Sequence, residues 1–181
     1  MPQYKFYMKK AVQSEGGWSV GEEVDLEEHF KGLRYKSCTG LRAYGNPKGV
    51  YAETYAESNR ARVYISPLPV YEQTDITLTL YFFDPQGRDT TSEEARQAAI
   101  KAAGDVYESF VEYVSGGAVV YRDTARQRKA LMYLADTSEP TTDSLKGIIY
   151  METAFKFKNV YGCTFDASDT TIEDYLSGDE E

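Results

Sequence analysis

The fold is decided by the stretch TDITLTLYF at residues 74–82. Its apolar side chains alternate with more polar ones and are Ile76, Leu78, Leu80 and Phe82. Alternation with a period of two, in a run rich in β-branched and aromatic residues, is typical of a β-strand with one buried face. The sequence DPQG at residues 84–87 is expected to end this strand, because proline cannot donate to the ladder and glycine favours a turn.

A long amphipathic helix is predicted from Thr91 to Ser115. The sequence TSEE at residues 91–94 indicates a capping box, in which the Thr91 hydroxyl accepts a hydrogen bond from the backbone of Glu94. One apolar stripe follows at helical spacing and consists of Ala99, Ala103, Val106, Phe110 and Tyr113. Gly116-Gly117 is expected to end the helix, since glycine takes the left-handed closing conformation without a Cβ clash. A single helix between β segments covers one face of a sheet, so these two elements define the predicted core.

Further strands are predicted on both sides of this core, from alternation and from turn residues. They cover residues 4–12, 33–41, 50–56, 60–65, 118–121, 127–134 and 148–157, with a short helical turn capped by Asp25 at residues 24–30. Residues 40–49 and 139–143 are expected to be loops. Roughly eight strands and one principal helix indicate an α+β fold, a mainly antiparallel β-sandwich or open barrel flanked by one long helix.

Negative charge is concentrated at the C-terminal end of the chain. The 181 residues carry a formal charge of −9, and residues 166–181 contain seven acidic residues without Lys or Arg, so the rest is about −2. We therefore expect one domain at residues 1–165, followed by an acidic tail at 166–181 that is frayed or docked on a partner. A near-neutral body disfavours sequence-independent binding of nucleic acid. Without an apolar segment of about 18 residues or an apolar signal core at residues 1–5, a soluble protein without a membrane segment is expected.

No residue pattern specifies a catalytic, cofactor or metal site. His29 is the only histidine, and it is expected to be an ordinary surface or half-buried residue. Cys38 and Cys163 match no zinc spacing and are predicted to be reduced thiols, with a disulfide as the alternative. The carboxylates of residues 166–174 lack the register of a calcium loop. The prediction is that the chain is not an enzyme and has no catalytic residues, cofactor or metal.

Five arginines are predicted to lie on strands beside tyrosines, and they are Arg60, Arg62, Arg122, Arg126 and Arg128. One interpretation is cross-strand pairing with Asp and Glu. The other is contact between subunits, because Tyr and Arg dominate interface hot spots. The candidate assembly contacts lie on the predicted hairpin of residues 51–65 and are Tyr51, Tyr55, Arg60, Arg62 and Tyr64.

Three stretches carry a resemblance to a known family. They are YAETYAESNRARVYI at residues 51–65, the segment 107–126 with its FVEYV and YRDTAR runs, and FKFKNVYG at residues 155–162. Together they resemble structural proteins encoded in the tail-morphogenesis regions of phages and prophages of Bacteroides-like bacteria. The resemblance covers residues 33–162. The element order is also similar to the fold shared by tail tube, tail terminator and distal tail proteins, in which a β-sandwich with one flanking helix forms rings by joining sheets across subunits.

The resemblance implies a non-enzymatic virion component, a ring-forming tail protein of the tube or of a tube-end adaptor. Its implied partners are copies of itself, in a hexameric ring or stacked rings, and other phage tail proteins. DNA would only pass through the lumen, and the protein would be assembled in the bacterial host cytoplasm and reside in the virion tail. The alternative is a monomeric ligand- or carbohydrate-binding β-sandwich module, in which Trp18 and the tyrosines stack on sugars. An enzyme that uses carboxylates is a third hypothesis.

Overall fold

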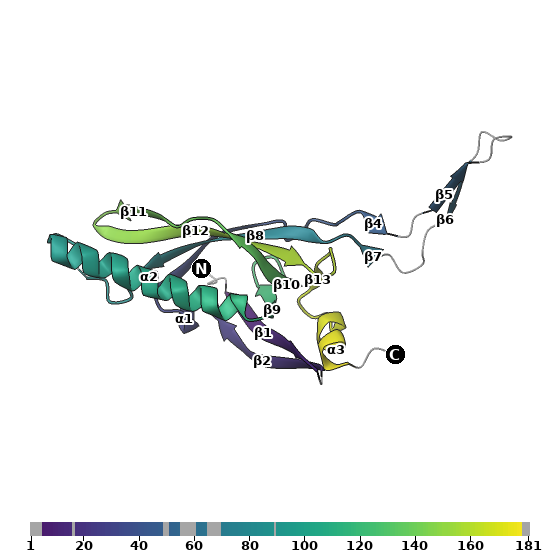
Figure 1. The fold of residues 1–181 in the computed structure, drawn as a ribbon, viewed down its shortest axis with the longest axis horizontal. Coiled ribbons are helices and arrows are strands. Elements are labelled where there is room, and N and C mark those ends of the chain that lie inside the picture. The colour runs from purple at the N-terminus through teal and green to yellow at the C-terminus, as the bar shows by residue number, and fades with distance from the viewer. Residues whose placement is uncertain are drawn as a thin grey trace.

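A computed structural model of the chain describes residues 5–15, 17–48, 51–54, 61–64, 70–88 and 90–178, with the backbone alone at 47, 51–54, 61–64 and 70. The fold is α+β: nine strands form one antiparallel sheet that carries a long helix (Figure 1). The hydrogen-bonded path runs β2 (Gly17–Asp25), β1 (Phe6–Ser14), β9 (Ala118–Asp123), β10 (Arg128–Thr137), β12 (Ile148–Asn159), β8 (Thr74–Phe83) and β3 (Leu33–Thr39). Off this path, β11 (Thr141–Leu145) pairs with β12, and β13 (Phe165–Asp166) pairs with β10.

Three helices and two small sheets complete the described structure. The helices are α1 (Leu26–His29), α2 (Glu93–Ser115) and α3 (Thr171–Ser177). The small sheets are β4 (Pro47–Lys48) with β7 (Val70–Tyr71), and β5 (Tyr51–Thr54) with β6 (Ala61–Tyr64). We call these four strands the arm, because in Figure 1 they project from the body at the end opposite β11.

The predicted core is confirmed. On β8 the four alternating apolar side chains are all buried, and α2 packs Ala99, Ala103 and Phe110 against the sheet. The ring centroids of Phe82 and Phe155 lie 6.0 and 5.0 Å from that of Phe110. Aromatic rings from one helix and two neighbouring strands therefore form the centre of the core.

Both ends of α2 differ in detail from the sequence prediction. The N-cap is Ser92 rather than Thr91, and its hydroxyl accepts from the backbone N–H of Ala95 at 3.1 Å. The helix ends at Ser115 as predicted, but Gly116 has a φ of −86°, so the expected left-handed closure is wrong. Glycine is needed at Gly117 instead, where φ is +154° and a Cβ would lie 2.6 Å from the Ala11 carbonyl oxygen.

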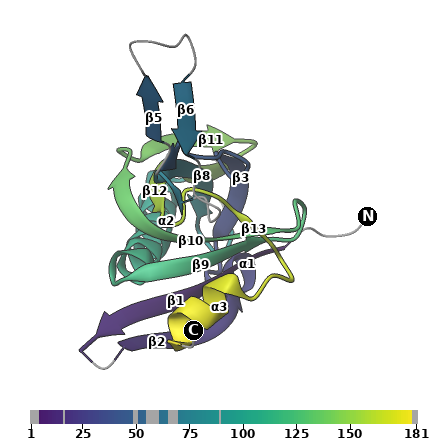
Figure 2. The same ribbon diagram turned by 90° about the vertical axis from the view of Figure 1, so that its right-hand side faces the viewer.

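The sheet curls, so that its two border regions approach each other. Figure 2 shows β3 and β8 on one side of the curl and β1 and β2 on the other. The rings of Phe6 on β1 and Tyr35 on β3 stack with centroids 3.8 Å apart. Since every strand of the path belongs to one hydrogen-bonded sheet, the architecture is closer to the predicted open barrel than to two stacked sheets.

Several described elements were not anticipated from the sequence. Strand β2 was not predicted, β11 overlaps the loop expected at residues 139–143, and β4 lies in the loop expected at residues 40–49. The hairpin predicted at residues 50–65 is present as β5 and β6, whereas its turn at 56–59 lies outside the described residues.

The acidic C-terminal segment folds on the sheet through residue 178. Ile172 and Leu176 of α3 are buried against Ala11, Val120 and Leu131, on the sheet face opposite α2. Glu173 pairs with Lys129, which is only 3% exposed. This packing differs from a frayed conformation, one of the two alternatives expected for the acidic segment, and docking of this segment on a partner stays a prediction.

Candidate assembly surface

Side chains that could act in catalysis or bind a metal are dispersed over the described part of the chain. Among those residues, no group of three or more His, Cys, Asp or Glu side chains is placed to hold a metal ion. His29 is exposed, as predicted, and its ring contacts Phe30. Asp169 accepts two hydrogen bonds from Thr171 at the start of α3, which lower the pKa of that carboxyl. No described helix combines the length and apolarity needed to cross a membrane.

Both cysteines are free thiols, as predicted. Cys38 lies on β3 with its side chain buried in the core, and this burial raises the pKa of its thiol to about 12. Burial also raises the pKa of Cys163, which is only half-buried. The reactive species is the thiolate, so both accessibility and pKa favour reaction at Cys163.

We expect iodoacetamide at pH 8 to label Cys163 about tenfold or more faster than Cys38 in the folded protein, because the buried thiol is protonated and shielded. Mass spectrometry of timed samples measures both rates, and Cys163→Ser and Cys38→Ser variants assign them. Equal rates at the two sites in folded protein would contradict this expectation.

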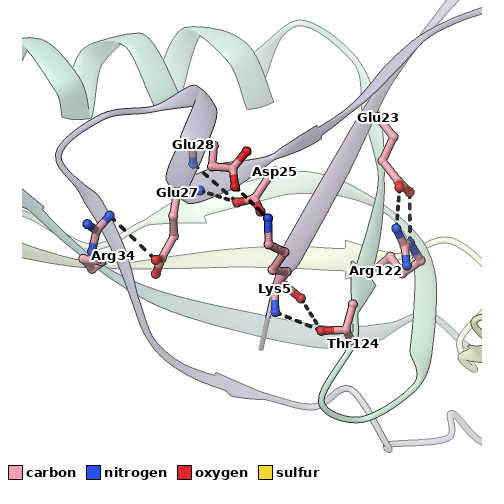
Figure 3. Close-up of polar contacts among 8 residues, drawn as sticks. All are labelled: Lys5, Glu23, Asp25, Glu27, Glu28, Arg34, Arg122 and Thr124. Carbon is pink, nitrogen blue, oxygen red and sulfur yellow. Dashed lines mark hydrogen bonds and ion pairs between the residues drawn. The ribbon is translucent and has the colours of Figure 1, made fainter. Parts of the chain in front are cut away.

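A polar cluster fastens α1 to the start of β1 (Figure 3). Asp25 caps α1 by accepting from the backbone N–H groups of Glu27 and Glu28 at 3.1 and 3.4 Å, as predicted for this residue. The Lys5 ammonium pairs with Glu28 at 2.6 Å and with Asp25 at 2.9 Å, which raises the pKa of Lys5. Thr124 exchanges hydrogen bonds with the backbone of Lys5. One lysine thus ties α1, β1 and the β9–β10 turn together.

Arg122 and Glu23 connect β9 to the outermost strand, β2. The guanidinium donates to both carboxylate oxygens, at 3.0 and 2.5 Å, and lies 4.3 Å from the Tyr7 ring centre on β1 (Figure 3). The pairing raises the pKa of Arg122. The pair links β2 to β9 across β1, which lies between them. Its two parallel hydrogen bonds fix the guanidinium and the carboxylate relative to each other.

Cross-strand pairing, one of the two interpretations of the arginines, is found at Arg122 and at Arg128, which pairs with Asp166 at 2.9 Å. Arg126 was predicted on a strand but lies in the β9–β10 turn, where it pairs with Asp123 three positions earlier. Arg60 lies outside the described residues, and at Arg62 only the backbone is described.

Arg126 closes the curl of the sheet by joining the β9–β10 turn to β3. Its partner Asp123 is fully buried. The same guanidinium donates to the Tyr35 hydroxyl at 3.1 Å and to the Cys38 carbonyl at 3.4 Å, both on β3. Burial raises the pKa of Tyr35, and its hydroxyl oxygen accepts this bond. Sequence reasoning named Arg126 but not this role, since Tyr35 is 91 positions away.

The border strand β3 is also covered by α1. The Tyr35 backbone N–H donates to the Glu27 carboxylate at 3.1 Å, and Arg34 lies 3.7 Å from the other oxygen of that carboxylate. The Leu33 carbonyl accepts from the Arg34 guanidinium at 2.9 Å. Side chains therefore occupy backbone groups that an approaching strand would need.

The arm is anchored firmly where it leaves the body. Gly45 donates to the Gly162 carbonyl at 2.8 Å, and Glu72 donates to the Asn46 carbonyl at 2.9 Å. A Cβ at Gly45 or Gly162 would lie 1.9 Å from the Glu72 carbonyl oxygen, so both positions need glycine for this close approach. The base of the arm is therefore tightly packed against the segment that follows β12.

Three of the five candidate assembly residues, Tyr51, Arg62 and Tyr64, lie on strands of this arm. Tyr51 lies opposite Tyr64 in the register of β5 and β6, and Arg62 lies opposite Glu53. Tyr55 and Arg60 are outside the described residues. Contact of these five residues with another subunit stays a prediction.

A shallow apolar hollow lies at the other end of the molecule, around the β11–β12 hairpin. It is lined by Arg34, Tyr81, Phe83, Leu145, Ile148 and Tyr150. Leu145 and Ile148 are 63% and 59% exposed, which is unusual for large apolar side chains that lie together. The sequence did not reveal this surface, because β11 was predicted as a loop.

Comparisons with known proteins reach only the level of the fold. No protein-family model matches this chain, and no curated protein matches it in sequence. Its fold is similar to a chain in the structure of the phage P2 baseplate in its activated conformation with Ca, with a TM-score of 0.50 and 14% identity, over 87% of this chain. A structure of the phage p2 baseplate with Sr gives a TM-score of 0.47 and 15% identity over the same share. The match spans 44% of the baseplate chain, less than half of its length.

Proposed function

We propose that this protein is a non-enzymatic structural component of a phage tail that assembles with copies of itself into rings or a tube. The fold likeness to a phage P2 baseplate chain is the observation that carries the proposal. The tail would contain the protein as a hexameric ring or stacked rings, next to other phage tail proteins, after assembly in the host cytoplasm.

The shape of the molecule supports a role in assembly. The arm projects from the body, so it is placed to contact a neighbouring subunit (Figure 1). The apolar hollow at the opposite end provides a second contact surface. Residues 179–181 account for three of the nine net negative charges, so the body through residue 178 has a net charge of about −6, and such a negative surface suits a lumen through which DNA passes without binding.

The carbohydrate-binding alternative has less support from the position of Trp18. That ring is half-buried and packs against Tyr175 of α3, with centroids 6.1 Å apart. Sugar stacking needs an open aromatic face, which α3 here covers in part.

Size-exclusion chromatography with light scattering, followed by negative-stain microscopy, tests the proposal. We expect a mass several times that of one chain at high protein concentration, and ring or tube outlines in the images. A strictly monomeric protein at every concentration, without rings or tubes, would contradict it.

A further inference from the structure

The sheet face opposite α2 carries a second apolar cluster, which α3 covers only in part. Val120 and Leu131 are buried there together with the apolar side chains of α3. Trp18 of β2 lines two hollows on this face, of about 370 and 350 Å³. Val12 lies in the first hollow and Val20 in the second, and they remain 40% and 44% exposed. The face under α3 is therefore larger and more apolar than α3 alone fills.

Helix α3 is a small unit that few contacts attach to the body. It has seven residues and buries two side chains, those of Ile172 and Leu176. Its Tyr175 ring lies 6.1 Å from the ring of Trp18, centre to centre. In the described part of the chain, the one hydrogen bond between α3 and another element runs from Lys129 to Glu173. A segment with so few buried contacts opens more readily than the sheet beneath it.

The single hydrogen bond involves a buried cation. Lys129 lies on the same face of β10 as Leu131 and is only 3% exposed. Its ammonium donates to one Glu173 oxygen at 2.6 Å, and the other oxygen lies 3.7 Å from Lys9. A buried ammonium that loses its counter-charge is strongly destabilising, because no water compensates for the lost partner. The docked position of α3 over Lys129 therefore depends on the charge of Glu173.

We propose that α3 is a releasable cover of this apolar face and that the ion pair of Glu173 with Lys129 controls its release. In the closed state, described above, Leu131 and Lys129 lie under the helix. In the open state α3 leaves the sheet as one unit, so water reaches the ammonium and the apolar cluster is exposed. This inference goes beyond the proposed function and does not depend on it, since it concerns two states of one chain.

Removal of the Glu173 charge tests the proposal in the full chain. Glu173→Gln keeps the size of the side chain but leaves the ammonium under α3 without a counter-charge, which favours the open state. Amides of residues 174–177 are expected to exchange hydrogen about tenfold or more faster than in the unmodified chain, while amides of residues 130–132 change by less than about threefold. When Lys129→Met is added, no charge remains to be buried, and exchange at 174–177 is expected to return to within about threefold of the unmodified chain. Asp174→Asn removes the same charge from an exposed position of α3 and is the matched control, with an expected change below about threefold.

Fluorescence gives a second readout, because Trp18 is the only tryptophan in the sequence. Its emission is expected to shift to longer wavelength in Glu173→Gln, where water replaces Tyr175 at the ring, and to shift back when Lys129→Met is added. Equal acceleration of exchange at 130–132 and 174–177 would overturn the inference, since the ion pair would then stabilise the whole fold rather than one segment. Unchanged exchange and emission in Glu173→Gln would overturn it as well. Both results leave the proposed function standing, because that function is tested by the oligomeric state.

Discussion

Replacing Phe110 by alanine is expected to lower the free energy of unfolding by about 3–5 kcal/mol. The side chain is fully buried between α2 and the sheet, and its ring meets those of Phe30, Phe82 and Phe155. These neighbours come from separate elements that are held by their own hydrogen bonds. They cannot collapse into the space that Phe110 leaves, so most of the cavity remains.

Urea denaturation followed by circular dichroism, at one fixed protein concentration, measures this loss. Glu108→Ala provides the control, because Glu108 is exposed on the same helix, and its effect is expected to stay within about 0.5 kcal/mol. A loss below about 1 kcal/mol for Phe110→Ala would mean that this cluster is not the centre of the core.

Removing the Arg126 side chain has the second large expected effect, a loss of about 3 kcal/mol in Arg126→Ala. The carboxylate of Asp123 is fully buried and loses its counter-charge, while Tyr35 and the Cys38 carbonyl lose a donor. The expected loss lies at the low end for a broken buried pair, because the Arg126 side chain itself is 33% exposed.

A double-mutant cycle with Asp123→Asn separates the charge from the packing. In the Arg126→Ala background, Asp123→Asn is expected to recover part of the lost stability, because it removes the unpaired buried charge. Arg128→Ala is the matched control from the next strand. Its partner Asp166 is 71% exposed, so we expect a cost below about 1 kcal/mol. Equal losses for Arg126→Ala and Arg128→Ala would argue against a special role for the buried pair.

The sequence predicted those elements whose burial repeats with a regular period. Strand β8 and helix α2 have one continuous apolar face each, so alternation and helical spacing were enough to locate them. The cap of α1 at Asp25 was predicted for a similar reason, since it depends on residues within one turn. Ser92 replaced Thr91 as the cap of α2 because adjacent hydroxyl residues offer the same chemistry, and only the chain path selects between them.

Elements that bury few side chains were not predicted. Strand β2 contains Gly17 and Gly21 together with two glutamates, and its residues are mostly exposed, so no alternation marks it. Helix α3 buries only Ile172 and Leu176 within an acidic segment whose charge suggested a solvated tail. Its position depends on Lys129 and Lys9, which pair with Glu173 from strands far away in sequence.

The surface that we propose for assembly was predicted only in part. Residues 51–65 were expected to form a hairpin from their own alternation and turn residues, and strands β5 and β6 confirm the pairing. The covering of border strand β3 could not be read from local sequence. It depends on Glu27, which reaches β3 from the preceding helix α1, and on Arg126, which only the curl of the sheet brings near from a distant part of the sequence.

The side chains that cover β3 bear on whether the protein aggregates at high concentration. Amyloid-like fibril growth adds strands repeatedly and therefore needs two free borders on every molecule. Glu27 and Arg126 obstruct one of these borders before any neighbour arrives. If a strand from another molecule binds at β2, the covered border β3 still hinders the addition of a further strand at the other side of the sheet. Repeated strand addition through the main sheet is therefore disfavoured.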